Sequence, residues 1–262
     1  MQERHINRKK YFDEQVYTTE KYVIPFITDY IKIDKNINVL EIGCGEGGNL
    51  KPFLDLGAYC VGVDLSEKKI ENGKSFFENH PNKNNLELIA ENIYNVNSLG
   101  REFDLIIMRD TIEHIPNQKK FLNELKKFLK PEGIVFIGFP PWQNPFGGHQ
   151  QVCSSKVLSH LPYFHLLPEK VYASVLRLFK EAPERIEALL EIKDTGISIE
   201  QFYDIVNSNE YEILKTEYFL FNPNYEIKFG LKPRRQFKFV SSIKYFRNFF
   251  TTALYVLIKQ KN

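Results

Sequence analysis

The stretch NVLEIGCGEGGNL, residues 38–50, places four glycines directly after a short apolar run. The aliphatic run is typical of a buried parallel strand, and the segment after the glycines predicts a helix that ends at Gly57. Glycines between a strand and a helix allow positive φ and let backbone amides approach a ligand, because no Cβ intervenes. The stretch therefore predicts either a tight turn or a ligand-binding loop.

The alternation of strand and helix that begins here continues to residue 141. Short apolar runs predict five strands, at residues 37–42, 59–65, 86–93, 102–110 and 133–141. Helical patterns lie between them, including one that Ser66 caps and one over residues 116–133 that Pro131 and Gly133 stop. Because the connections are short, they imply right-handed crossovers, and we expect an α/β fold with a doubly wound parallel sheet.

The remaining chain departs from this alternation. A helix interrupted by Pro25 is expected over residues 18–32, before the first strand. Residues 142–196 hold proline-punctuated helical segments, interpreted as an insertion over the ligand face. Its aromatic residues either line an apolar pocket or pack the inserted helices: Trp142, Phe146, Tyr163, Phe164 and His165. A helix capped by Ser198 then leads to two strands, at 211–223 and 250–260, joined by a basic loop.

Composition excludes several classes of protein. The chain has 262 residues, 43% of them hydrophobic, and a net charge of +2, which is too mild to indicate nucleic acid binding. Three cysteines without metal-finger spacing argue against a disulfide framework, and a polar start and the lack of a 20-residue apolar run argue against a signal peptide or a membrane span. We therefore expect a cytoplasmic protein.

The end of the chain carries an uneven charge. Residues 227–262 contain Lys and Arg but no Asp or Glu, with Phe and Tyr interleaved. This segment could contact anionic lipid, a phosphorylated acceptor or RNA, and the plainer alternative is a solvated loop with an amphipathic helix. We expect at most a weak peripheral contact of this segment with a membrane, and no nucleic acid partner.

An acid at the end of the second predicted strand adds meaning to the glycines. Asp64 follows the loop by about twenty residues, where a carboxylate can accept both hydroxyl protons of a ribose. Gly43, Gly45 and Gly47 are spaced G-x-G-x-G, but Gly43, Gly45 and Gly48 also give the G-x-G-x-x-G spacing of the dinucleotide fingerprint. The spacing by itself therefore does not exclude a dehydrogenase. Strand, loop, helix and acid in this order predict an adenosine-type ligand.

At this point the chain resembles the class I S-adenosylmethionine-dependent methyltransferases, through VLEIGCGEGG, VGVDLS, LIAENIYN and FDLIIMRDTIEHI. The resemblance implies S-adenosylmethionine as cofactor and a seven-stranded, mostly parallel sheet whose last strand is antiparallel. It places cofactor-binding roles on Glu41, Gly43, Cys44, Gly45, Gly47, Asp64, Leu65, Asn92, Ile93 and Arg109. The sequence departs from the family at Asn92, where an acid is usual, and Glu91 could replace that acid only if the loop turns.

The resemblance covers about residues 32–141 and the final two strands, and the insertion lies outside it. We expect a single methyltransferase domain over residues 1–262, with the cofactor-binding core at 33–141. The insertion and acceptor lid occupies 142–196, and the last helix and the two C-terminal strands occupy 197–262.

Acids and histidines follow the fourth and fifth predicted strands. If the segment after strand four is helical, Asp110, Glu113 and His114 share one face at the carboxyl end of the sheet, and His149 lies beyond strand five. These four residues suit a divalent ion such as Mg or Mn, while His114, His149 and Asp110 are the candidate catalytic groups. The alternative is a polar helix start with a packed histidine.

The arrangement resembles two subgroups of the family that methylate hydroxyls. The acids and histidines are similar to those of metal-dependent small-RNA 3′-terminal 2′-O-methyltransferases, and Glu113 with His114 is similar to ubiquinone-pathway O-methyltransferases. We expect O-methylation of a small-molecule hydroxyl, such as that of a glycan or lipid precursor, with or without metal assistance. The alternatives are an RNA 3′-end 2′-O-methyltransferase and a non-catalytic module that only binds the cofactor.

Overall fold

The computed structural model describes residues 7–261. Residues 1–6, part of the polar start on which the expectation of no signal peptide rests, and residue 262 lie outside the described residues. All three cysteines are free and buried. Within the described range, no helix combines the length and the apolarity that crossing a membrane requires.

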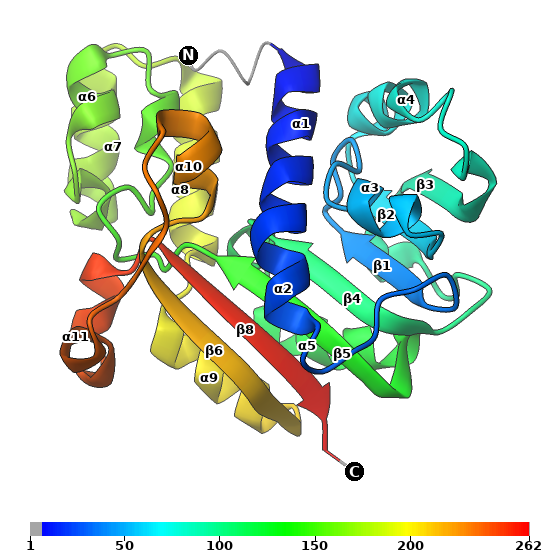
Figure 1. Ribbon diagram of the computed structural model, residues 1–262. Helices are drawn as coiled ribbons and strands as arrows, with labels where there is room; N and C mark the ends of the chain where they lie inside the picture. The colour runs from blue at the N-terminus through cyan, green and yellow to red at the C-terminus, as the bar shows by residue number, and fades with distance from the viewer. Residues whose placement is uncertain (1–6, 262) are drawn as a thin grey trace.

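One sheet organises the molecule (Figure 1), with strands in the order β3-β2-β1-β4-β5-β8-β6-β7. The strands are β1 (Asn38–Ile42), β2 (Tyr59–Asp64), β3 (Leu86–Ala90), β4 (Phe103–Arg109), β5 (Leu129–Phe139), β6 (Tyr211–Phe221), β7 (Arg234–Arg235) and β8 (Ala253–Gln260). The first five pair in parallel, and β8 runs antiparallel to both β5 and β6. The strand order reverses between β1 and β4, where open α/β sheets bind ligands.

The expected α/β architecture is confirmed, with one strand more than predicted in the described chain. The extra strand, β7, has two residues and pairs with β6 inside the basic loop. It was not predictable because two exposed arginines carry no strand pattern. The fifth strand also begins earlier than expected, since β5 runs through Pro131 and Gly133 rather than following them.

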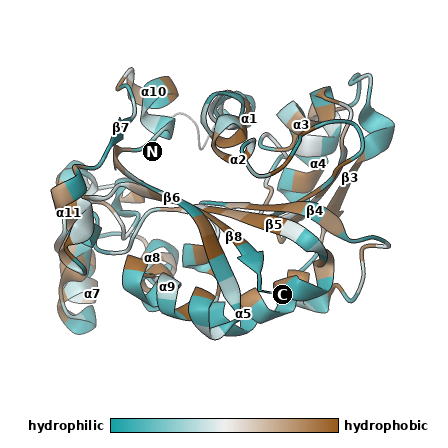
Figure 2. Ribbon diagram, turned by 60° about the horizontal axis from the view of Figure 1, so that its bottom comes forward, coloured by the Kyte–Doolittle hydropathy of each residue, from teal (hydrophilic) through white to brown (hydrophobic). Residues whose placement is uncertain are grey.

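Helices cover both faces of the sheet (Figure 2). On one face lie α1 (Arg8–Thr18), α2 (Ile24–Ile27), α3 (Lys51–Asp55) and α4 (Glu67–Phe76), and on the other lie α5 (Gln118–Leu125) and α9 (Ile199–Ser208). Each face has its own apolar cluster, built around Phe53 on the first and Phe202 on the second. Because the strands are buried on both sides, they read as continuous apolar runs rather than as alternating ones.

The N-terminal helix differs from the prediction for residues 18–32. It begins at Arg8, where the Asn7 side chain accepts a hydrogen bond from the Lys10 amide. A π-helical turn, Thr19–Val23, joins α1 to α2, and Pro25 lies in the first turn of α2. Val23 and Ile24 both have right-handed helical backbone angles, so the chain stays helical up to Pro25, and the interruption expected there takes the form of the π-helical turn.

Between β5 and α9 the chain forms α6 (Lys156–His160), α7 (Glu169–Leu178) and α8 (Pro183–Thr195), which share a third apolar cluster around Tyr172 and Leu176. The predicted cap at Ser198 is present as a capping box with Gln201, which starts α9. Two short helices, α10 (Asn224–Phe229) and α11 (Lys238–Ser242), lie in the connection from β6 to β8. These segments decide what surrounds the carboxyl ends of the strands.

Candidate functional site

The glycine loop between β1 and α3 has the positive-φ backbone that its composition predicts. Gly43, Gly45 and Gly47 all have positive φ. The amides of Gly43 and Cys44 both donate to the Val63 carbonyl, which ties the loop to the end of β2. A Cβ on Gly43 would lie 2.6 Å from Thr111 Oγ1, so the loop also packs directly on the segment after β4.

The N-terminal helix crosses this loop, a contact that no sequence motif indicated. A Cβ on Gly48 would lie 2.7 Å from the Phe12 carbonyl oxygen. Arg8 donates two hydrogen bonds of 2.6 Å to the carboxylate of Glu46, whose side chain is fully buried. Gly48 is therefore required by close packing of α1 over the loop rather than by the loop's own turn.

Asp64 lies where the sequence placed it, at the carboxyl end of β2. Its Oδ2 accepts from the Gly45 amide at 2.8 Å and its Oδ1 from the Ser66 amide at 2.9 Å. Lys69 Nζ lies 3.8 Å from Oδ1. Each carboxylate oxygen has a second lone pair, and Asp64 lines the adjoining cavity, so the carboxylate can both hold the loop and accept from a ligand.

A cavity of about 890 Å³ opens over the carboxyl ends of the strands. Several residues expected to bind the cofactor or to act in catalysis line it: Gly43, Asp64, Leu65, Asn92, Ile93, Asp110 and His114. Leu65 is 75% exposed, although it follows a buried strand, so an apolar surface faces the cavity. Others lie behind or beside the cavity wall: Glu41, Cys44, Gly45, Gly47, Arg109, Glu113 and His149. Cys44 faces the core, where a Cβ on Gly62 would touch its Sγ.

The third motif keeps its position but not its expected chemistry. Asn92 Oδ1 accepts from the Tyr94 amide and thus caps a short 3₁₀ turn, Ile93–Asn95. Glu91 Oε1 accepts from the Asn92 amide and from Asn95. Glu91 and Asn92 both line the cavity, so either one can meet an adenine base.

Behind the glycine loop, Glu41 and Arg109 form a buried polar group. Asn49 donates from Nδ2 to Glu41 Oε1, and Arg109 donates to Thr19 Oγ1 at 3.4 Å and to Asn224 Oδ1 at 3.0 Å. Among the described residues, Glu41 Oε2 and Arg109 Nε have no hydrogen-bond partner. Buried polar atoms are normally paired, so an orphaned acceptor and donor beside the loop are suited to a polar ligand.

Glu41 gives the apoprotein a testable pH dependence. Burial raises its pKa from 4.5 to about 8, against the opposing effects of Asn49 and Arg109. The stability that Glu41 contributes through its bound proton is fully present below pH 4.5. It is lost as pH rises from 4.5 through 8, and the free energy of unfolding falls by up to about 1.4 kcal/mol per pH unit. We expect urea unfolding at pH 5 and pH 8 to show a smaller loss for Glu41→Gln than for the wild type. The exposed control Glu87→Gln should keep the wild-type loss, and a Glu41→Gln profile parallel to the wild type would contradict this assignment.

The segment after β4 is not the helix on which the shared face depended. Asp110 has φ of 53°, and only a 3₁₀ turn, Ile112–His114, follows. Asp110 Oδ2 instead lies 3.4 Å from Asn224 Nδ2 of α10 and 3.9 Å from Arg109 Nε. The left-handed residue turns the Asp110 carboxylate toward α10.

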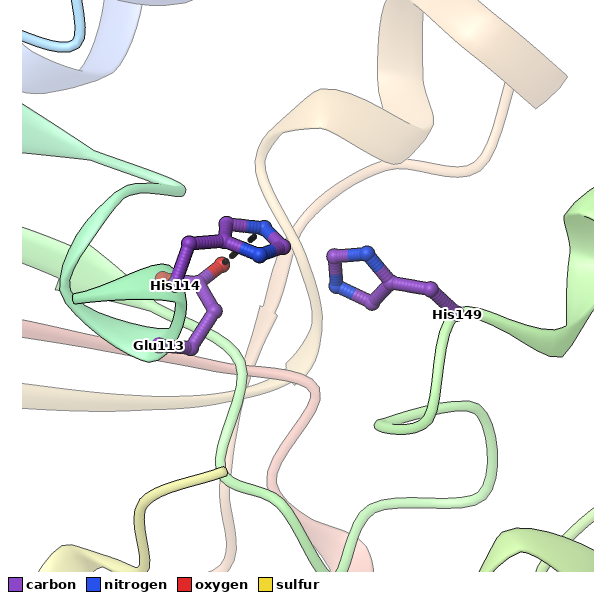
Figure 3. A group of neighbouring side chains, drawn as sticks. All are labelled: Glu113, His114 and His149. Carbon is purple, nitrogen blue, oxygen red and sulfur yellow. Dashed lines mark ion pairs between the residues drawn. The ribbon is translucent and has the colours of Figure 1, made fainter. Parts of the chain in front are cut away.

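Glu113, His114 and His149 do converge (Figure 3), and their ligand atoms lie within 4.8 Å of one another. In the part of the chain that the structure describes, this group does not include Asp110. The two imidazole rings are 4.9 Å apart and edge to face, with His149 reaching in from the loop after β5. Three of the four proposed metal ligands are therefore together.

Glu113 is the unusual member of this cluster. Its side chain is buried, and neither carboxylate oxygen has a hydrogen-bond partner within residues 7–261. Burial, and then the Asp110 carboxylate, raise the pKa of Glu113 well above its ordinary range. Burial also lowers the pKa of His114, which favours the neutral imidazole that binds metals. The donor set suits a divalent ion, which would supply the missing partner of Glu113.

The inserted helices contribute side chains that the sequence did not single out. Glu191, Asp194 and Thr195 of α8 line the same cavity as Asp64. They could not be found in advance because they belong to no motif and only the packing of α8 brings them there. The aromatic residues of the insertion follow the packing alternative at Phe164 and His165. Phe164 is buried in the third apolar cluster, and the fully buried His165 accepts at Nδ1 from Gln150 Nε2 and donates from Nε2 to the Trp142 carbonyl.

Comparisons with known proteins agree with this geometry. A methyltransferase domain model matches residues 16–145. The ubiquinone biosynthesis O-methyltransferase of Bartonella tribocorum is 34% identical over 128 residues, which is 46% of this chain, and the chain spans only about half the length (49%) of that relative. An uncharacterized protein of Rickettsia prowazekii is 29% identical over 68% of this chain and 82% of its own length.

Solved structures agree on the fold. Magnesium protoporphyrin IX methyltransferase from Synechocystis PCC 6803, crystallised with SAH, superposes with a TM-score of 0.56 at 14% identity, over 95% of this chain and 84% of that one. The segment that matches the methyltransferase domain model, residues 16–145, contains the glycine loop, Asp64 and the Glu113–His114 pair. The chain belongs to the class I S-adenosylmethionine-dependent methyltransferases.

Proposed function

We propose that the cavity binds S-adenosylmethionine, with the ribose hydroxyls on Asp64. The adenine would lie between Leu65 and the Asn92–Ile93 backbone, because an exposed leucine on a cavity wall gains from covering an aromatic base. The methionine end would lie along Gly43 and Gly45, where the unpaired atoms of Glu41 and Arg109 offer a hydrogen-bond acceptor and a donor behind the loop. The SAH bound in the Synechocystis relative supports this choice of cofactor.

The proposed reaction is methyl transfer to a hydroxyl group of a small molecule. The hydroxyl oxygen attacks the methyl carbon, the carbon–sulfur bond breaks, the sulfonium leaves as a neutral thioether, and a base takes the hydroxyl proton. The observation that supports a hydroxyl acceptor is the cluster of Glu113, His114 and His149 beside the cavity. Hydroxyls need activation that the sulfonium itself does not provide, and neutral imidazoles can accept the proton.

A divalent ion fits this cluster. When bound, it lowers the pKa of an acceptor hydroxyl and aligns it for attack. Glu113 would supply the charged oxygen ligand and His114 and His149 the two nitrogens, all without competing hydrogen bonds at the Glu113 carboxylate. Asp110, turned toward Asn224, remains on the cavity wall, where it can orient the acceptor.

The charges around the cavity favour a small acceptor over RNA. Among the described residues, Lys69 is the one lysine or arginine that lines the cavity. Five carboxylates line it: those of Asp64, Glu91, Asp110, Glu191 and Asp194. Phosphate groups would be repelled at this wall, whereas an acceptor rich in hydroxyls or carrying positive charge would be attracted. The names of the ubiquinone-pathway relatives also support an oxygen acceptor.

A two-step experiment tests this function. Calorimetry with SAH should give one site per chain, and a screen of hydroxylated acceptors with labelled cofactor should then show transfer that chelation abolishes and Mn²⁺ or Mg²⁺ restores. Binding without transfer to any acceptor would contradict the enzyme assignment. Transfer that exhaustive chelation leaves unchanged would contradict the metal but leave the histidine base in place.

Asp64→Asn tests the cofactor seat alone. The amide keeps the shape of the carboxylate but loses its charge and turns one acceptor into a donor that faces the Gly45 amide, the Ser66 amide or the ribose. Because hydrogen bonds to a charged group contribute about 1.5–3 kcal/mol, the Kd for SAH should rise about 10- to 100-fold. Glu67→Gln makes the same charge change at an exposed position on α4 and should bind like the wild type. Equal affinities of the two variants would place the ribose elsewhere.

A further inference from the structure

The connection between β6 and β8 exposes an unusual number of apolar side chains. Of the nineteen large hydrophobic residues exposed within residues 7–261, ten lie between residues 227 and 250. We call these ten the C-terminal surface: Ile227, Phe229, Leu231, Phe237, Phe239, Ile243, Tyr245, Phe246, Phe249 and Phe250. Phe239 and Tyr245 are each 69% exposed. Concentrated exposure of this kind marks an interaction surface, because apolar side chains scattered singly are the norm.

Buried polar contacts fix the backbone of this segment. Arg247 donates to Glu200 Oε1 at 3.0 Å, and Asn248, which is 1% exposed, donates to Glu200 Oε2 and accepts from the Ile199 amide. Gln236 donates to the Phe250 carbonyl. The segment thus turns polar residues inward and aromatic residues outward, which is the reverse of the usual arrangement. The apolar exposure therefore belongs to a well-anchored structure.

Positive charge surrounds the apolar side chains. Residues 227–250 contain seven Lys or Arg and no acid: Lys228, Lys232, Arg234, Arg235, Lys238, Lys244 and Arg247. Among them, Arg235 pairs with Glu217 and Arg247 pairs with Glu200. The excess of positive charge selects a negatively charged partner.

The shape of the C-terminal surface decides which partner it fits. The three described cavities, of about 890, 650 and 590 Å³, are lined entirely by residues outside 227–250. Figures 1 and 2 place α11 at one edge of the molecule, outside the two helical layers. Protruding Phe, Ile and Leu side chains among lysines match the fluid interface of a bilayer.

We propose that the C-terminal surface binds the face of an anionic lipid bilayer, with its aromatic side chains in the interfacial layer and its lysines and arginines on the headgroup phosphates. The surface also touches the insertion, since Tyr163 donates to the Phe249 carbonyl and the two rings lie 6.3 Å apart. Attachment would therefore hold the lid side of the molecule against the membrane. This binding does not depend on the proposed reaction.

Vesicle flotation of the whole chain tests the proposal. The probes are phosphatidylcholine vesicles, the same vesicles with about 30% phosphatidylglycerol, and a single-stranded oligouridine as the competing polyanion. The wild type should float with the anionic vesicles, remain below with the neutral ones, and be released as NaCl is raised from about 0.05 to about 0.5 M.

Two variants separate the apolar and the electrostatic parts. Phe237→Ser/Phe239→Ser should lower partitioning into anionic vesicles by about tenfold or more, because two exposed aromatic rings no longer enter the interface. Lys232→Glu/Lys238→Glu should lower it at low salt and lose the salt dependence. Leu56→Ser/Ile213→Ser removes two exposed apolar residues that lie outside the C-terminal surface and should float like the wild type.

Thermal unfolding and SAH binding, measured on each variant, establish that the fold is intact. Wild-type protein that stays with neither vesicle, or binds only oligouridine, would overturn the proposal, as would Phe237→Ser/Phe239→Ser and Lys232→Glu/Lys238→Glu both floating like the wild type. Loss of flotation in the Leu56→Ser/Ile213→Ser control to the same degree would also overturn it. Because vesicle binding needs no acceptor, these outcomes are independent of any failure to detect methyl transfer.

Discussion

Gly43→Ala is expected to eliminate measurable cofactor binding and to lower the free energy of unfolding by about 2–5 kcal/mol. One part of the loss is conformational, because φ at Gly43 is 74° and an L-residue there costs roughly 1–2 kcal/mol. The other part is steric, because the new Cβ would lie 2.6 Å from Thr111 Oγ1 and 2.7 Å from Cγ2, and overpacking typically costs about 1–3 kcal/mol. Urea unfolding and SAH calorimetry measure both effects.

Gly100→Ala is the matched control for the backbone part. Gly100 has φ of 70°, but a Cβ there meets no described atom within 4 Å. It should lose only the conformational part, roughly 1–2 kcal/mol, and bind SAH normally. Adding Thr111→Gly to Gly43→Ala should recover part of the stability. Equal losses in Gly43→Ala and Gly100→Ala would show that the contact with Thr111 is not tight in solution.

Glu113→Gln is expected to abolish metal binding and to lower methyl transfer by about 1,000-fold without changing the affinity for SAH. The amide keeps the size of the side chain but cannot provide a charged ligand, and losing several kcal/mol of metal-assisted activation corresponds to this factor. Metal content of the purified protein, single-turnover transfer and calorimetry provide the three readouts.

The stability of Glu113→Gln separates a functional from a structural role. In the metal-free protein the variant should be at least as stable as the wild type, since it replaces a buried, unpaired ionisable group with a neutral one. His149→Ala should also lose metal, whereas His160→Ala, on α6, should not. A Glu113→Gln enzyme with full metal content and full activity would refute the proposed cluster.

The comparison between sequence and structure is clearest at β1 and β2. Two patterns here are local: glycines after an aliphatic run, and an acid at the end of the next strand. Each one sets the conformation of its own backbone or of an adjacent residue. Asp64 therefore lies within hydrogen-bonding distance of Gly45, and the cavity forms over the carboxyl ends of the strands. Parallel pairing alone brings these two residues together.

Where long-range packing decides the outcome, sequence patterns were less informative. The prediction of a helix after β4 required Asp110 to be helical, but its positive φ and its contact with Asn224, 114 residues away in the chain, turn the carboxylate elsewhere. The packing of α1 on the glycine loop likewise depends on the contact between Arg8 and Glu46, 38 residues apart in the chain. Contacts between residues this distant leave no local pattern to read.

The sequence by itself determined the α/β sheet, the glycine loop and the acid that follows it, because strand periodicity, glycine conformation and helix capping are properties of neighbouring residues. Only the tertiary structure decided that Glu113 and His149 meet while Asp110 does not, that α8 lines the cavity with carboxylates, and that the last connection faces its aromatic residues outward. Each of these features depends on how elements that are distant in the sequence pack against the sheet. The burial and the charge of the side chains follow from that packing, so no local pattern encodes them.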